Sequence, residues 1–237
     1  MEYTPKAVEE RTRSMGSRVE RMLPLSQEFM LPWIGERYER TSFRLLIIGD
    51  SVYHDPKGPI NWTECPRLAA IGSCEEGRLH FGGMYDVRWP GKGNFWSSVV
   101  TYVTGAELAG EEFVNVWEDW AFWELIQTPL QGSRSKPSPE QFKLGWTAFD
   151  QLVRLLKPKP DLVVGLSCRM RDEFKKAYSG RFDRVDDSDD CFELMFFPTA
   201  VRVLFLAHPR SLLYKKRTAL QVHGRFLEVV ARNGGRP

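Results

Sequence analysis

The chain has 237 residues, of which 42% are hydrophobic and 27% are charged, the composition of a globular protein with a sizeable core. Its net charge of +2 neither requires nor excludes nucleic acid, and no apolar run approaches the roughly twenty residues of a membrane span. The first residues lack the apolar segment of a signal peptide, so we expect a cytoplasmic protein with no membrane association. Four scattered cysteines form no C-x-x-C pair, so we expect free thiols, no metal and no cofactor; they are Cys65, Cys74, Cys168 and Cys191.

The first forty residues predict a helical extension, with an amphipathic helix from about 5 to 23. An apolar run over residues 43–48 then predicts a buried strand that stops at Gly49. Four polar side chains follow within five residues: Asp50, Ser51, Tyr53 and His54. Because ligands bind where parallel strands end, we expect these residues at the rim of a sheet.

A long segment, about 55–93, is rich in proline and glycine and shows no periodic pattern. Loops of this length are usually functional or disordered, so both a substrate-reading lid and a surface insertion stay open. Asn94 then caps a short helix that Gly105 ends.

The remaining chain alternates predicted strands and helices. Ser138, Pro139 and Gln141 form a capping box that begins a helix reaching about 156. The other elements are strands near 120–126, 161–167 and 200–207, and helices near 169–177 and 213–231, with residues 191–197 as a candidate extra strand outside the central sheet. This order predicts an α/β fold: a three-layer α/β/α sandwich around a mostly parallel, four-stranded central sheet, forming a single domain over 1–237.

Three predicted strands end in polar residues. The first delivers the cluster that begins at Asp50, the second delivers Glu124 and Gln127, and the last delivers His208 and Arg210. The carboxyl ends of parallel strands share one edge of a sheet, so we expect these side chains to converge there.

Gly49, Asp50 and Ser51 resemble the nucleophile block of GDS-type lipases and esterases, with Ser51 as the nucleophile. That chemistry needs a histidine base and an acid that orients it, which the family supplies in a D-x-x-H block. Phe205 stands three residues before His208, and Leu220 three before His223, so this block is missing. An esterase remains an alternative.

A second resemblance covers more of the chain, about residues 43–230 without the 55–93 insertion. Residues 49–54 (G-D-S-V-Y-H) resemble the G-Q-D-P-Y-H motif of uracil-DNA glycosylases, and residues 208–212 (H-P-R-S-L) resemble their H-P-S-P-L motif. Both stand where that family places them, after the first and the last strand. The resemblance implies a member of the uracil-DNA glycosylase-like superfamily that binds DNA, flips a base and hydrolyses its N-glycosidic bond.

Breaking an N-glycosidic bond builds positive charge on the sugar and negative charge on the departing base. Asp50, with Asp55 in reserve, is the carboxylate that can stabilise the sugar cation, and His208 can stabilise the base. The remaining predicted base-pocket residues are Ser51, Tyr53, His54, Phe95, Trp96, Trp123, Glu124 and Gln127, with Phe122 as a further stacking candidate. The predicted DNA contacts are Arg134, Arg210, Ser211, Leu212 as the wedge that fills the duplex, Lys215 and Lys216.

The sequence departs from the family pattern at two positions. Ser51 stands where the family's water-activating Asp is usual, which transfers that role to Asp50. Glu124 stands where uracil-specific members use an Asn, with Asn115 as a rival match. An ionised carboxylate only accepts hydrogen bonds, so it suits the exocyclic amine of cytosine or adenine and repels the O4 of uracil. We therefore expect a modified base such as a modified cytosine rather than plain uracil.

The segment from Arg210 onward is strongly basic, with Glu228 as its acidic residue. Its basic residues are Arg210, Lys215, Lys216, Arg217, Arg225, Arg232 and Arg236, which suits phosphate contact. Four aspartates within 186–190 are interpreted as a solvated acidic loop, with a metal site as the less common reading. We expect a monomeric DNA glycosylase in repair or phage defence; an inactive DNA- or nucleotide-binding member of the fold is the other alternative.

Overall fold

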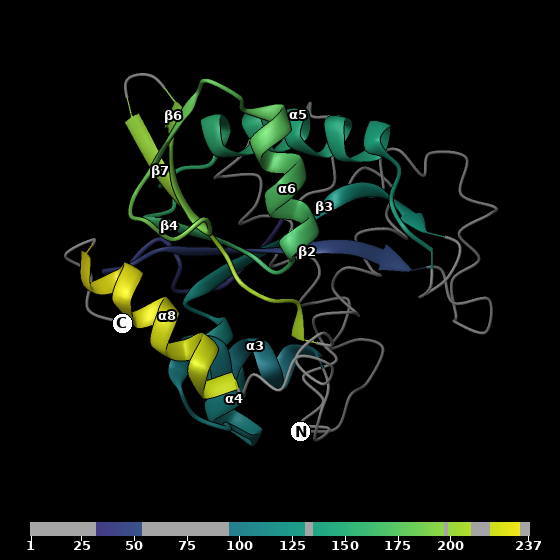
Figure 1. Ribbon diagram of the computed structural model, residues 1–237. Coiled ribbons are helices and arrows are strands. Elements are labelled where there is room, and N and C mark those ends of the chain that lie inside the picture. The colour runs from purple at the N-terminus through teal and green to yellow at the C-terminus, as the bar shows by residue number, and fades with distance from the viewer. Residues whose placement is uncertain (1–31, 54–94, 131–134, 197–198, 210–218, 233–237) are drawn as a thin grey trace. The chain divides into compact units, whose positions relative to one another are not determined.

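The computed structural model describes residues 32–53, 95–130, 135–196, 199–209 and 219–232 (Figure 1). The strands are β1 (Trp33–Ile34), β2 (Leu45–Tyr53), β3 (Trp120–Leu130), β4 (Leu162–Gly165), β5 (Phe182–Arg184), β6 (Cys191–Phe196) and β7 (Thr199–Phe205). The helices are α3 (Phe95–Thr104), α4 (Gly110–Trp117), α5 (Pro139–Leu155), α6 (Cys168–Ala177) and α8 (Ala219–Arg232). The fold is therefore mixed α/β. The predicted N-terminal helix and the 55–93 segment lie outside the described residues.

The strands form one seven-stranded sheet in the order β1-β3-β2-β4-β7-β6-β5. β2, β4 and β7 run parallel, with Ile47 opposite Val164 and Val164 opposite Leu204. β6 is antiparallel to β7, and β5 is antiparallel to β6. The prediction of four strands is thus wrong, because the sheet is extended at its edges. β1 has two residues and β5 three, too few for an apolar pattern to mark them in the sequence.

The middle of the sheet confirms the reading of apolar runs as buried strands. Residues 45–48 of β2 and 162–164 of β4 are at most 1% exposed. Parallel strands are covered on both faces, which is why their sequences are apolar without alternation.

Two sequence patterns correctly predicted where a helix begins or ends. The Ser138 side chain accepts a hydrogen bond from the Gln141 backbone N–H, and the Gln141 side chain accepts one from the Ser138 N–H, so the capping box is confirmed. Gly105 follows α3 with φ of 73°, the left-handed conformation that favours glycine at a helix end. α4 was not predicted, since its eight residues bury little beyond Phe113 and Trp117.

The chain divides into two compact units. The first contains residues 1–34, 49–87 and 122–159, and the second contains 35–48, 88–121 and 160–237. β2 passes from the second unit to the first between Ile48 and Gly49, and β3 does so between Ala121 and Phe122. Within the second unit α8 packs along α3, and α6 and α8 lie on opposite sides of β4 (Figure 1). Because strands continue through both units, the expectation of a single domain stays a prediction.

Candidate functional site

The polar residues after Gly49 belong to β2 itself, because the strand continues to Tyr53. The prediction that the strand ends at Gly49 is therefore wrong, since backbone pairing outlasts the apolar run. Asp50 and Ser51 are each only 9% exposed. Successive side chains of a strand point to opposite faces, so these two neighbours serve different sides of the sheet.

Glu124 on β3 lies against the backbone of Gly49. A Cβ atom added at Gly49 would stand 2.3 Å from Oε2 of Glu124 and 2.8 Å from its Oε1. Glu124 is 6% exposed, so its carboxyl group is held inside the first unit rather than in solvent. Glycine at position 49 leaves the space that this carboxyl group occupies.

Two causes raise the pKa of Glu124 well above its ordinary value of 4.5: burial, which is the larger, and the negative charge of Asp50. The structure thus favours a neutral Glu124, which can donate as well as accept a hydrogen bond. The sequence analysis expects an ionised carboxylate at this position, which only accepts hydrogen bonds.

Ser51 has a buried hydroxyl group. Its Oγ makes no hydrogen bond within the described part of the chain. Nucleophilic serine chemistry requires a hydrogen-bonded base. The described residues therefore give the esterase alternative no activated serine.

In the second unit, His208 lies beside an aromatic cluster on α3. The rings of His208 and Phe95 are 5.5 Å apart at 41°, and both residues are partly exposed. Phe95 contacts Trp96 edge-on at 5.0 Å, and Trp96 contacts Trp117 at 5.3 Å. The structure therefore brings together three residues that the sequence placed in one site from opposite ends of the chain: His208, Phe95 and Trp96.

Trp123 lies in a different environment from the one predicted for it. It has no exposed surface, and its ring lies 6.4 Å from that of Phe149 on α5. Phe122 is also fully buried. Both rings are therefore core residues in this structure, and stacking on a base would require them to leave the core.

The other predicted site residues are only partly covered by the structure. Tyr53 and Gln127 are strand residues whose side chains are not described. The rival Asn115 is an exposed residue of α4. The residues that lie outside the described ranges are His54, Asp55, Arg134, Arg210, Ser211, Leu212, Lys215 and Lys216.

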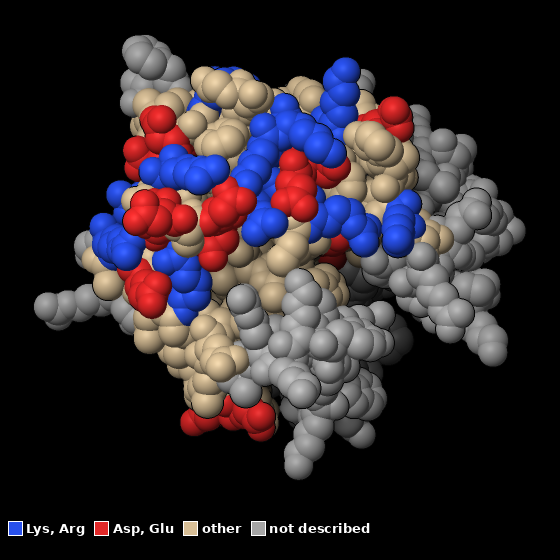
Figure 2. Space-filling model, in the orientation of Figure 1, with Lys and Arg blue, Asp and Glu red and all other residues tan. Residues whose placement is uncertain are grey.

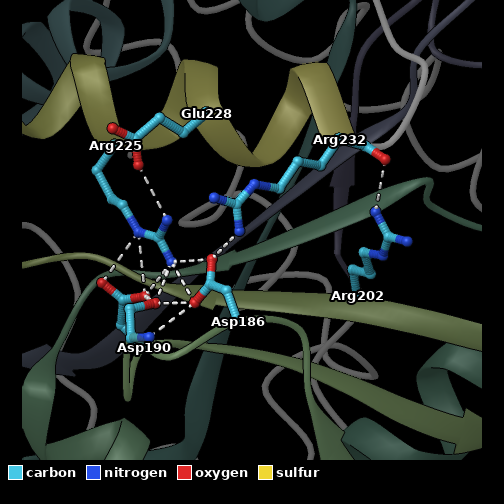
Figure 3. Close-up of polar contacts among 7 residues, drawn as sticks. Asp186, Asp190, Arg202, Arg225, Glu228 and Arg232 are labelled. Carbon is cyan, nitrogen blue, oxygen red and sulfur yellow. Dashed lines mark hydrogen bonds and ion pairs between the residues drawn. The ribbon is translucent and has the colours of Figure 1, made fainter.

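Two arginines of the basic C-terminal segment bind carboxylates. The Arg225 guanidinium contacts Asp190 at 2.6 Å, Asp186 at 3.0 Å and Glu228 at 3.1 Å, and Arg232 contacts Asp186 at 2.6 Å (Figure 3). Ser188 also hydrogen-bonds within this group. The acidic segment is therefore an ion-pair cluster that contacts α8 through Arg225 and Arg232. The phosphate-contact prediction for this segment stays a prediction.

Charges of both signs are interleaved on the face shown in Figure 2. On α6, Arg171 pairs with Asp172 at 2.9 Å and Lys176 with Glu173 at 2.7 Å, and Lys175 pairs with Asp189. Paired charges of this kind do not make the one-sign surface that attracts a phosphate backbone.

A cavity of about 560 Å³ lies in the second unit, at the amino end of β2. Leu45, Trp120 and Phe226 contribute apolar walls, and His223 contributes an imidazole group whose Nδ1 is 3.0 Å from the Tyr102 carbonyl oxygen. None of the predicted site residues lines this cavity. Its lining comes from scattered positions, and no local sequence pattern marks it.

Within the described ranges, no group of three or more His, Cys, Asp or Glu side chains could hold a metal ion. None of the described helices is both long and apolar enough to cross a membrane. No protein-family model matches the chain, and a search of curated proteins found no similar sequence.

Proposed function

We propose that this chain is a DNA glycosylase of the uracil-DNA glycosylase-like type, with the three-layer α/β/α arrangement of that fold. It flips a base out of DNA and hydrolyses the bond between the base and deoxyribose. The observation that supports this most is that Asp50 and Glu124 are both buried carboxyl groups and that the charge of Asp50 acts on Glu124. Both come from strand positions that the resemblance assigns to the chemistry.

Paired carboxyl groups with unequal environments suit glycosidic hydrolysis, because one can stay ionised while the other stays neutral. Asp50 stabilises the sugar cation and orients the attacking water. Ser51, the next residue, has a hydroxyl group where the family usually has a carboxylate. Asp50 therefore carries the role alone, unless Asp55 shares it.

His208 and Phe95 act on the departing base. A histidine can donate a hydrogen bond to the carbonyl oxygen on which negative charge develops. An aromatic ring beside it offers a face on which a flipped base can stack. The 5.5 Å separation of these two rings supports this pairing of roles.

The base we propose is a modified one, such as a modified cytosine, rather than plain uracil. Glu124 is the residue that reads its edge. The protein is proposed to act as a cytoplasmic monomer on DNA, without a metal or cofactor.

Mass spectrometry of free bases tests this function. The purified full-length chain is incubated with plain DNA, uracil-containing DNA and phage DNA with modified cytosine. We expect release of the modified base, and a fall of about 10²- to 10⁴-fold for Asp50→Asn and for His208→Ala. Release of uracil with modified-cytosine DNA left intact would refute the assigned substrate.

The alternatives give different results in the same assays. An inactive binding member retards DNA on a gel and releases no base from any substrate. An esterase cleaves small esters and loses that activity in Ser51→Ala alone.

A further inference from the structure

We propose that Glu124 is a catalytic acid, which protonates the ring nitrogen beside the exocyclic amine of the departing base. This rests on the proposed glycosylase function and deepens it. In this proposal Glu124 does more than accept a hydrogen bond from the base. It donates the proton that helps the N-glycosidic bond to break. It also names the substrate class: bases in which an amine stands next to an accepting ring nitrogen, as in cytosine and its 5-substituted forms.

The first support is the place of the carboxyl group. It fills the volume beside Gly49, where Oε2 would be 2.3 Å from an added Cβ. Glu124 is 6% exposed, so its carboxyl group is largely removed from water. An ionised carboxylate is costly in such surroundings, whereas a neutral carboxyl group is tolerated.

The second support is its charged neighbour. Asp50, the next residue after Gly49, acts on Glu124 through its negative charge. Two neighbouring carboxyl groups resist ionising together, so one ionised and one neutral group is the favoured state. Burial, the larger cause, raises the pKa of Glu124 well above its ordinary value, so we place the proton on Glu124.

The third support is chemical fit. A neutral carboxyl group has one acceptor oxygen and one O–H donor. Its carbonyl oxygen accepts from the N4 amine of cytosine while its O–H donates to N3. An ionised carboxylate would face the N3 lone pair with a second lone pair, which is repulsive.

The bond between C1′ of the sugar and N1 of the base breaks, and its electron pair stays with the base. The Glu124 proton moves to N3, so the base leaves neutral. Water adds its hydroxyl group to C1′ and gives its proton to Asp50. Exchange with solvent then returns a proton to Glu124 and removes one from Asp50.

Glu124→Gln separates this role from simple recognition. Glutamine keeps the size and can still donate to N3 and accept from the N4 amine, but it has no proton to transfer. On oligonucleotides with 5-hydroxymethylcytosine we expect kcat to fall about 10²- to 10⁴-fold with KM changed less than about threefold. As pH rises through the pKa of Glu124, the kcat of wild type should fall. The kcat of Glu124→Gln should show no such fall. The exposed Glu107→Gln is the control and should match wild type.

A second measurement needs no activity. Infrared spectroscopy of the full-length protein at neutral pH should show the carbonyl stretch of a neutral carboxyl group. The band should persist in Glu107→Gln, disappear in Glu124→Gln, and be lost at lower pH in Asp50→Asn than in wild type. Its absence from wild type would overturn the proposal.

The outcomes also separate the two levels of proposal. If wild type releases no base from any DNA, the glycosylase function fails and the catalytic acid fails with it. If wild type releases the base and Glu124→Gln keeps both the rate and the fall of kcat with rising pH, only the catalytic acid is overturned.

Discussion

Gly49 and Glu124 are sterically coupled: the carboxyl group of one fills the space that a side chain on the other would need, with 2.3 Å between Oε2 and an added Cβ. Separations under 3.0 Å force something to move, and here the moving atom belongs to a buried side chain. A side chain at position 49 would therefore require the carboxyl group of Glu124, on the neighbouring strand, to shift.

Gly49→Ala should lower the free energy of unfolding by about 1–3 kcal/mol, the usual cost of overpacking a filled interior. Glu124→Asp, which shortens the side chain by one methylene, should recover part of that loss in the double variant. Denaturant unfolding measures both effects. Gly224→Ala is the control, because nothing lies within 4 Å of an added Cβ there. Additive losses from Gly49→Ala and Glu124→Asp would contradict the coupling.

Glu124→Gln should make the protein more stable at neutral pH. The pKa of Glu124 is raised in the folded state, so the unfolded chain releases this proton first as pH rises above about 4.5. Wild type therefore loses stability between that pH and the folded-state pKa, and the glutamine variant does not. Thermal melts from pH 4 to pH 8 should show the two proteins converging at low pH and separating as pH rises. A constant difference across this range would argue against a neutral Glu124.

Arg225→Ala should be strongly destabilising. The side chain is 18% exposed, and its partners Asp186 and Asp190 are 13% and 28% exposed. Among the described residues, removing it leaves Asp190 with Ser188 and no cation, and leaves Asp186 with Arg232 as its remaining cation. Breaking a buried pair by removing one partner costs about 3–5 kcal/mol. Arg154→Ala is the matched control, since its pair with Asp150 lies on a helix surface and contributes under about 0.5 kcal/mol. Equal losses in the two variants, by urea unfolding, would show that the cluster does not anchor α8.

Cys191 should be inert in the folded protein. It has no exposed surface, and burial raises the pKa of its thiol to about 12. Cys168 is free and partly exposed at the start of α6. Alkylation at pH 8, mapped by peptide mass spectrometry, should modify Cys191 at least about a hundredfold more slowly than Cys168. The two should react alike in denaturant, and rapid labelling of native Cys191 would contradict its burial.

Sequence patterns within a few neighbouring residues correctly predicted several helix ends and buried strands. The capping box at Ser138, the stop at Gly105 and the apolar runs of β2 and β4 depend on neighbouring residues, so the sequence alone located them. The edge strands and α4 were missed or left open because short elements acquire their stability from the strand or helix beside them.

The same division holds for the candidate site. The sequence by itself determined that acidic, imidazole and aromatic side chains occur beside the apolar runs, since composition and spacing are local. It could not determine that Glu124 sits against Gly49, that His208 meets Phe95, or that Arg225 is bound by aspartates. Those contacts join residues 35 or more positions apart, and only chain folding brings them together. The tertiary structure also raises the pKa of Glu124, through burial and the charge of Asp50, whereas the residue type gives only the starting value.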